Sequence, residues 1–494
     1  MPGGSQLPGR GVVAAGHPAT AEAAAGVLRD GGNAVDAAVA GVLASFAAEP
    51  LLTGLGAGGY LLVAPPAAEP VLLDFFVEAP GRGADPAARE ELVPVDVSFG
   101  DATQLFHIGP ASVGVYGAPA GLAAAADRFG SRPLSELAAP AAALARAGVP
   151  LSQVQAYVVA ILEDIVTATP ECAAIFAPRG TLLREGDPLR QPDLAEALER
   201  LGRDGAAPFY TGDIAERVLD WLAGRGSMLT AEDLASYRVA DRVPVRVGYR
   251  GREVLVNPPP SAGGILIAYA LALLERETAP PTPARLVEAM ESAQDERTPE
   301  FLEGLSEPGF LDRFLAARLG STTHISVLDG AGLACSVTCS NGEGSGIVVP
   351  GTGVHLNNML GEEDLNPLGF HRHPPGRRLP SMMCPTVVLQ DGRPELVLGS
   401  AGSNRIRSAL VQTIVRVLDE GLDIAAAVEA PRIHYEDGVV YVEPGIDTSG
   451  LEHLGHGLAR FQGPNLFFGG VAAVQRDPAA GAGDPRRGGA AALA

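Results

Sequence analysis

The sequence predicts an α+β protein in which two packed, largely antiparallel sheets carry helices on their outer faces. Strand-like runs lie near both ends of the 494-residue chain, and the stretch from about residue 120 to 225 is mainly helical in pattern. This order lacks the regular strand–helix alternation of a doubly wound parallel sheet. Hydrophobic residues make up 47% of the chain, which is enough to form a large core.

Two alanine-rich helices open the predicted fold. Pro18 suits the first turn of one helix, and Gly31-Gly32 ends it. Asn33 can cap the second helix with Asp36 three residues later, and Glu49-Pro50 ends that helix. The small side chains of both helices indicate close packing against a sheet.

A glycine-rich loop, Gly54–Gly59, follows the second helix and matches the G-x-G-x-x-G pattern of dinucleotide-binding proteins. That pattern requires a strand before the loop and a helix after it. Here a helix precedes the loop and a strand, Tyr60–Val63, follows it. The sequence therefore favours a glycine turn that leads into a core strand, with Val71–Phe76 as the partner strand.

The remaining strands are predicted mostly in the last third of the chain. A hairpin is expected over Val245–Val256, and a helix over Arg405–Leu418. Residues 276–320 are charged and rich in proline, so we expect an exposed segment there, and we expect the Ala- and Gly-rich last residues to fray. The predicted strands of this part are His324–Leu328, Ala334–Ser340, Pro385–Leu389, Leu396–Leu398 and Val439–Val442.

Composition excludes several classes of function. A formal net charge of −22 argues against binding to nucleic acids and to anionic membranes. All 36 basic residues are arginine, so a Schiff-base lysine and a P-loop lysine are both excluded. No apolar run reaches the roughly 18 residues of a membrane span, and the N-terminus lacks a signal-peptide pattern, so we expect a cytoplasmic protein. We expect free thiols at Cys172, Cys335, Cys339 and Cys384.

Two adjacent threonines, Thr322 and Thr323, stand at the start of a predicted strand. A threonine hydroxyl is a weak nucleophile at neutral pH and needs an adjacent base. Cleavage of the Ser321–Thr322 bond would release an α-amine, whose unperturbed pKa of about 7.7–8.0 suits that role. Two threonines before an alternating strand are also ordinary β-branched strand residues, and the local sequence alone does not separate these interpretations.

An acyl-transfer site also needs hydrogen-bond donors for an oxyanion. The loop Gly399–Asn404 lies between a predicted strand and the helix that starts near Arg405, and backbone N–H groups at a helix start favour negative charge. A phosphate-binding loop and a plain strand-to-helix turn are alternatives for the same residues. No G-x-S-x-G serine nucleophile stands between a predicted strand and a helix.

Taken together, several motifs resemble the gamma-glutamyltransferase family over nearly the whole chain, roughly residues 11–490. The markers are unrelated to one another and occur in the family's order. They are Gly31–Ala38, Gly54–Gly59, Asp233-Leu234, Pro258–Gly264, Thr322-Thr323-His324, Gly351-Thr352-Gly353, Asn357-Asn358 and Asp484-Pro485-Arg486.

The resemblance implies a four-layer αββα sandwich of the N-terminal-nucleophile (Ntn) hydrolase type, which cuts itself into chains 1–321 and 322–494 that stay associated. Ser321 and Thr322 would flank the cleaved bond, and Thr322 would be the nucleophile. The expected partners are a small-molecule acyl donor and an amine or water as acceptor, with a homodimer left open. No metal and no organic cofactor are implied.

Further site residues follow from their positions in the family's motifs. Each has one implied role in catalysis or substrate binding. They are Ser340 beside the nucleophile, Asn341 on the glutamyl group, Glu362 near the substrate's α-amine, Ser381 on its α-carboxylate, and Gly402 with Ser403 in the oxyanion loop.

Substrate recognition departs from the family pattern. Phe76 stands where the family's carboxylate-binding arginine would be, and Pro380 replaces the first of two serines. Phenylalanine cannot form the forked pair that an arginine makes with a carboxylate. We hypothesise that Arg377 or Arg378 supplies the missing charge, although both also suit a solvated basic loop.

Three functions therefore stay open. The first is cleavage of γ-glutamyl amides, such as glutathione-like donors, through an acyl-Thr322 ester. The second keeps the enzyme class but changes the substrate, because Phe76 and Pro380 alter the glutamyl clamp, and some relatives are acylases or cleave carbon–carbon bonds. The third is an unprocessed, non-catalytic homologue that acts as a binding protein.

Overall fold

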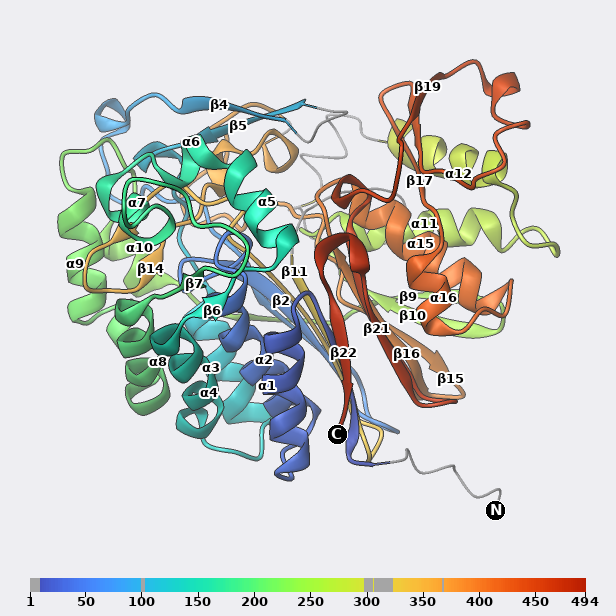
Figure 1. Ribbon diagram of the computed structural model, residues 1–494, viewed down its shortest axis with the longest axis horizontal. Helices are drawn as coiled ribbons and strands as arrows, with labels where there is room; N and C mark the ends of the chain where they lie inside the picture. Colours follow the sequence, from blue (N-terminus) through green and yellow to red (C-terminus); the bar gives the residue numbers. More distant parts are fainter. Residues whose placement is uncertain (1–8, 99–102, 297–304, 306–322, 367) are drawn as a thin grey trace.

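The structure is a computed structural model that describes residues 9–98, 103–296, 305, 323–366 and 368–494 (Figure 1). Ser321 and Thr322, the predicted cleavage site and nucleophile, lie outside the described residues, and the description resumes at Thr323. None of the helices in these ranges combines the length and the apolar character that crossing a bilayer requires.

One central sheet has seven strands in the order β22-β1-β11-β12-β2-β3-β8, and each neighbouring pair is antiparallel. Its middle strand, β12, ends at the predicted site residue Ser340. The strands are β1 (Gly11–Ala15), β2 (Gly58–Ala64), β3 (Val71–Phe75), β8 (Ala240–Arg242), β11 (Thr323–Asp329), β12 (Ala334–Ser340) and β22 (Ala490–Leu493).

The second central sheet has six antiparallel strands in the order β21-β20-β16-β15-β10-β9. Strand β16 ends at the predicted oxyanion loop. The strands are β9 (Val245–Tyr249), β10 (Arg252–Val256), β15 (Thr386–Gln390), β16 (Arg393–Ala401), β20 (Gly470–Gln475) and β21 (Ala480–Gly483).

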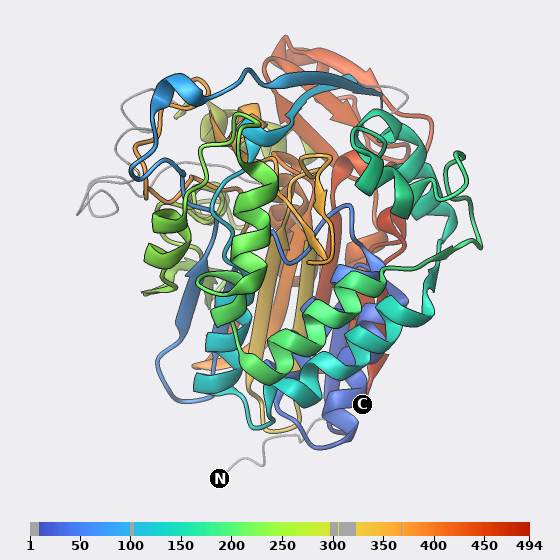
Figure 2. The same ribbon diagram turned by 90° about the vertical axis from the view of Figure 1, so that its left-hand side faces the viewer.

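The two sheets pack face to face around a shared apolar core. Leu62 and Leu328 from the first sheet join Val397 and Val474 from the second in one buried cluster. The outer face of the first sheet packs against α1 (Pro18–Arg29) and α2 (Ala34–Ala48), and that of the second against α11 (Gly263–Leu274) and α15 (Arg405–Leu418). Figure 1 shows these helix groups on opposite sides of the sheets, and Figure 2 shows the first group in front of the strands.

Smaller elements surround the central sheets. A hairpin of β4 (Val93–Ser98) and β5 (Thr103–Ile108) lies along the upper edge in Figure 1. The other helices are α3 (Ala118–Phe129), α4 (Leu134–Ala147), α5 (Gln153–Ile161), α6 (Glu163–Val166), α7 (Pro170–Phe176), α8 (Pro192–Asp204), α9 (Asp213–Leu222), α10 (Ala231–Ser236), α12 (Pro283–Asp295) and α16 (Ile424–Glu429). The other strands are β6 (Val149–Pro150), β7 (Pro188–Leu189), β13 (Val348–Val349), β14 (Val354–His355), β17 (Ile433–Glu436), β18 (Val439–Val442) and β19 (Gly457–Arg460).

Local sequence signals account for several element boundaries. Pro18 stands in the first turn of α1, and Asn33 forms a capping box with Asp36 at the start of α2. The glycine loop Gly54–Gly59 leads directly into β2, and β2 pairs with β3. Both features agree with the predicted glycine turn before a core strand. All four cysteines are free and buried, as expected.

The expectation that the C-terminus frays is wrong, and the expectation of an exposed segment over 276–320 holds at residues 276–280 but not over α12. The C-terminal residues do not fray, because β22 pairs with β1 and places Leu493 opposite Val12. Within the segment expected to be exposed, α12 buries one face, including Val287 and Met290, against the second sheet's helical layer. In both places, packing or pairing with a distant part of the chain stabilises a helix or strand that the local sequence predicts only weakly.

Candidate active site

A polar pocket lies where the ends of β12 and β16 meet. Ser340, the last residue of β12, lines it together with Gly402 and Ser403, which follow β16. Glu362 reaches the same pocket from the segment after β14. Thus the structure gathers four of the predicted site residues in one place.

An apolar wall faces this polar side. It comes from the residues after α2, from strand β5, from α5 and the residue after it, and from the segment before β20. Its members are Leu52, Phe106, Val158, Ile161, Leu162 and Leu466.

Two carboxyl groups, those of Glu343 and Glu362, share the polar side of the pocket. Burial raises the pKa of Glu343 to about 7. Burial, followed by the charge of Glu343, raises the pKa of Glu362 well above its ordinary value. A hydrogen bond between the two carboxyl groups lowers the pKa of Glu343 and raises that of Glu362, so Glu362 is the member that holds the proton.

Gly342 makes the close approach of these acids feasible. It has a φ of 68°, and a Cβ at this position would lie 2.0 Å from Oε1 of Glu362. A side chain here would therefore be strained and would displace the carboxyl group.

Two guanidinium groups line the same pocket, and the sequence had not indicated either as a site residue. Nε of Arg405 donates to the carbonyl oxygen of Phe467 at 3.0 Å, and Nη2 of Arg487 donates to that of Leu466 at 3.2 Å. Burial, and then the like charge of Arg405, lower the pKa of Arg487 to about 10. The charges of Glu343, Asp484 and Glu49 act on the pKa of Arg487 in the opposite direction. Two guanidinium groups that line one pocket can bind an anion there.

Arg487 also lies beside the oxyanion loop. Its Nη2 would be 3.5 Å from a Cβ placed on Gly402. The signal for this residue was present in the sequence, because Arg487 directly follows the marker Asp484-Pro485-Arg486.

The predicted oxyanion loop has an unusual backbone. Ser403 has a φ of 51°, in the left-handed region that non-glycine residues rarely occupy. Its hydroxyl donates to Asp364, and the amide of Arg405 donates to the carbonyl oxygen of Gly402 at 3.0 Å. Such strain, which costs on the order of 1–3 kcal/mol, is concentrated at functional sites in proteins.

Asn341 and Ser381 line neither this pocket nor its neighbours within the described chain. Nδ2 of Asn341 donates to the carbonyl oxygen of His355 at 3.1 Å, while its Oδ1 is buried without a described partner. Oγ of Ser381 accepts from the amide of Met383 at 3.1 Å. Their contacts in the structure are thus to the backbone, and their roles in binding stay predictions.

Arg378 likewise lines none of these pockets among the described residues. Its guanidinium donates to the carbonyl oxygen of Phe76 and lies 3.6 Å from Asp74 and 3.5 Å from Glu78. The ring of Phe76 stacks on Tyr60 in the core between the sheets, with centroids 5.5 Å apart. Arg378 thus pairs with carboxylates of the fold, and its role towards a substrate stays a hypothesis.

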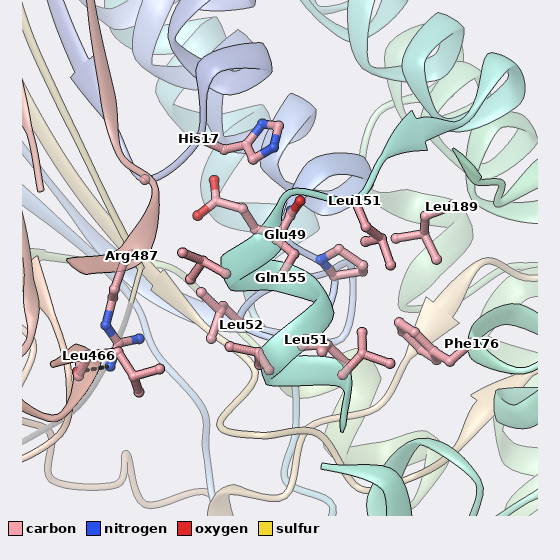
Figure 3. A pocket seen from close by; sticks show the side chains of 15 residues that line it. His17, Glu49, Leu51, Leu52, Leu151, Gln155, Phe176, Leu189, Leu466 and Arg487 are labelled. Atoms are coloured by element: carbon pink, nitrogen blue, oxygen red, sulfur yellow. Dashed lines mark hydrogen bonds between the residues drawn. The ribbon is translucent and has the colours of Figure 1, made fainter. Parts of the chain in front are cut away.

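A second cavity adjoins the polar pocket (Figure 3). The two share Leu52, Val158, Leu466 and Arg487. Figure 3 shows His17, Glu49 and Arg487 on one side of the cavity and Leu51, Leu189 and Phe176 on the other.

Buried ion pairs hold the turn that presents Arg487. Asp484 lies 2.5 Å from Arg432 and 3.2 Å from Arg486, and all three side chains are 1% exposed. The cationic neighbours lower the pKa of Asp484 despite its burial.

Asp484→Ala is expected to lower the free energy of unfolding by about 3–5 kcal/mol, because it leaves Arg432 and Arg486 short of a buried partner. Urea denaturation measures this change. Asp241→Ala is the matched control, because its pair with Arg128 is exposed and should be worth under about 1 kcal/mol. Equal losses in the two variants would contradict a structural role for the buried group.

The chain is similar to known proteins over nearly its whole length. The family described as Gamma-glutamyltranspeptidase matches residues 20–494. The chain is 31% identical to a glutathione hydrolase proenzyme of Bacillus subtilis (strain 168), over 94% of this chain and 88% of that protein. It is 30% identical to the acylase ACY 1 proenzyme of Pseudomonas sp. (strain SE83), over 95% and 90%.

A solved structure is similar over the full length. The cephalosporin acylase from Bacillus halodurans superposes with a TM-score of 0.83 at 27% identity, covering 100% of this chain and 98% of that one. The chain is thus similar in sequence to proteins with two different kinds of printed name, glutathione hydrolase and acylase, and a solved acylase has the fold described above.

Proposed function

Because the chain belongs to the gamma-glutamyltranspeptidase family, we propose that it is a self-processing amide hydrolase or acyltransferase with Thr322 as its N-terminal nucleophile. The word proenzyme in the names of the relatives supports processing. The order of helices, sheet, sheet and helices supports the four-layer Ntn-hydrolase sandwich.

Cleavage before Thr322 would give chains 1–321 and 322–494, and strand order supports their lasting association. In the first sheet, β1 lies between β22 and β11, and β2 lies beside β12. In the second sheet, β10 pairs with β15. Strands of both parts thus share hydrogen bonds in each sheet, and separation would expose both apolar cores.

In the proposed reaction, the Thr322 oxygen bonds to the carbonyl carbon of the amide, and its proton passes to the α-amine of the same residue. The backbone N–H groups of Gly402 and Ser403, before the start of α15, would stabilise the charge on the carbonyl oxygen. The C–N bond then breaks, and the leaving amine takes the proton. Water or another amine opens the resulting ester and restores the hydroxyl.

The observation that carries the choice of donor is the pairing of two carboxyl groups with two guanidinium groups in one pocket. A free amino-acid head presents an ammonium to Glu343 and Glu362 and a carboxylate to Arg405 and Arg487. We therefore propose γ-glutamyl amides as donors, bound by a clamp that does not need an arginine at the position of Phe76.

A second candidate is an acylase that acts on a donor without an amino group. The apolar wall of the pocket and the core position of Phe76 favour it, as does the similarity to proteins named acylases.

Two anilides separate these candidates, because γ-glutamyl-4-nitroanilide and glutaryl-4-nitroanilide differ only in the amino group. The proposed clamp predicts a kcat/KM roughly 10–100-fold higher for the γ-glutamyl compound, as expected from one charge-assisted interaction of about 1.5–3 kcal/mol. Equal rates, or faster cleavage of the glutaryl compound, would favour the acylase. A single uncut chain that turns over neither compound would indicate the non-catalytic binding protein.

A further inference from the structure

Glu49 is a buried carboxyl group that the proposed mechanism does not use. It follows α2 and is only 7% exposed. Oε1 accepts a hydrogen bond from Oγ1 of Thr20 at 2.9 Å, and Oε2 accepts one from Oγ1 of Thr323 at 3.1 Å. Three elements therefore meet at one carboxyl group: α1, the end of α2, and the start of β11.

The surroundings of Glu49 disfavour its charge. The cavity beside it is lined mainly by leucine, valine and phenylalanine side chains (Figure 3). Burial raises its pKa to about 7, while the hydroxyls of Thr20 and Thr323 and the charge of Arg487 act in the opposite direction.

The other polar groups that line this cavity are those of His17 and Gln155. Burial lowers the pKa of His17, so its imidazole is neutral near pH 7. Arg487 is accordingly the cation that faces Glu49 among the described groups lining the cavity. A carboxyl group kept in such a place, with hydroxyl donors on both oxygens, suggests a functional role.

Thr323 connects Glu49 to the site. It is the residue directly after Thr322, and in β11 it pairs with Cys339, the neighbour of Ser340 in β12. Thr20 and Glu49 precede the proposed cleavage site, whereas Thr323 and Arg487 follow it. The hydrogen bond at Oε2 would therefore hold the front end of the small chain against the large chain.

We propose that Glu49 is a positioning residue whose charge state controls the reaction: its carboxylate holds Thr323, and with it the start of β11, in the arrangement that reaction at the preceding residue requires. This inference rests on the proposed function. The protonated form carries no charge to attract Arg487 and is a weaker acceptor for both hydroxyls, so the start of β11 is held less firmly.

Glu49 and the α-amine must then lose a proton for full activity, as must Glu343 of the proposed clamp, whose pKa is also raised to about 7. On the acidic side, a plot of log kcat/KM against pH is expected to be steeper in wild type than in Glu49→Gln by about one unit of slope. In Glu49→Gln, kcat falls more than KM changes. If the acidic side of the pH profile is the same in wild type and in Glu49→Gln, the proposal is wrong.

Thr20→Val provides a sharper readout, because Thr20 lies on α1, does not line either pocket, and donates to Glu49. Loss of that donor raises the pKa of Glu49, so the Glu49 step should move to higher pH by several tenths of a unit or more. Thr20→Ser, which keeps the hydroxyl, should restore the wild-type midpoint. A purely structural role predicts lower activity without this shift, and that result would contradict the proposal.

Infrared titration keeps the test independent of turnover. Glu343 and Glu362 also carry raised pKa values, so the spectra are taken as differences against Glu49→Gln, in which their bands cancel. The remaining protonated carboxyl band of Glu49 should disappear near pH 7 in wild type and at higher pH in Thr20→Val. If wild type cleaves neither anilide, the proposed function fails while the band still reports the Glu49 site. If Glu49→Gln does not fold, wild type is compared directly with Thr20→Val. The same pH midpoint for the carboxyl band in these two proteins would refute the inference.

Discussion

Thr322→Ala is expected to leave the chain uncut and to lower anilide turnover by roughly 10,000-fold or more, the scale of losing a catalytic nucleophile. The alanine methyl can neither attack the carbonyl of Ser321 nor capture an acyl group. Denaturing electrophoresis and initial rates measure the two effects on one preparation.

Thr322→Ser is the matched control, since it keeps the hydroxyl and should process and turn over at a reduced but measurable rate. Thr323→Ser is a second control, because it keeps the donor to Glu49. Full activity of Thr322→Ala would place the nucleophile elsewhere.

Arg487→Met is expected to raise the KM for γ-glutamyl-4-nitroanilide by roughly 10–100-fold, because it removes a charge-assisted contact worth about 1.5–3 kcal/mol. The half-buried guanidinium lies beside both Arg405 and the oxyanion loop, so a carboxylate between the two arginines would lose half of its partners. Saturation kinetics measures KM and kcat separately. Arg487→Lys should recover only part of the loss, because an ammonium cannot form the fork.

Arg378→Met is the comparison for this result, because it tests the alternative source of positive charge. In the structure Arg378 contacts Asp74, Glu78 and the carbonyl of Phe76, so we expect its loss to lower the free energy of unfolding and to leave KM nearly unchanged. A larger KM effect at Arg378 than at Arg487 would reverse the assignment of the anion site.

The sequence predicted best those elements whose signals are local. The first turn and the end of α1, the capping box of α2, and the full extents of β12 and α15 follow from proline, glycine and capping residues, β-branched runs and helical periodicity. Strands β1 and β22 were missed because their short Ala-rich runs become strands only through pairing with each other and with β11. Secondary structure of this kind depends on contacts between the two ends of the chain.

The site residues also divide into those that local motifs predict and those that only the folded chain brings together. Ser340, Glu362, Gly402 and Ser403 were located through motifs, and the structure brings them together. Arg487 belongs to a different sequence region and joins them only because β20 and β21 carry its turn back to the oxyanion loop. Arg405, Glu343 and Glu49 were missed as well, since nothing in their local sequence shows that they are buried near opposite charges.

Intact-protein mass spectrometry after brief incubation with γ-glutamyl-4-nitroanilide reports self-cleavage and acylation of Thr322 together. The proposed mechanism predicts two masses that match residues 1–321 and 322–494, with a glutamyl adduct only on the smaller chain and, after digestion, on its first residue. An active protein that retains the mass of the uncut chain, or an adduct on any other residue, would contradict it.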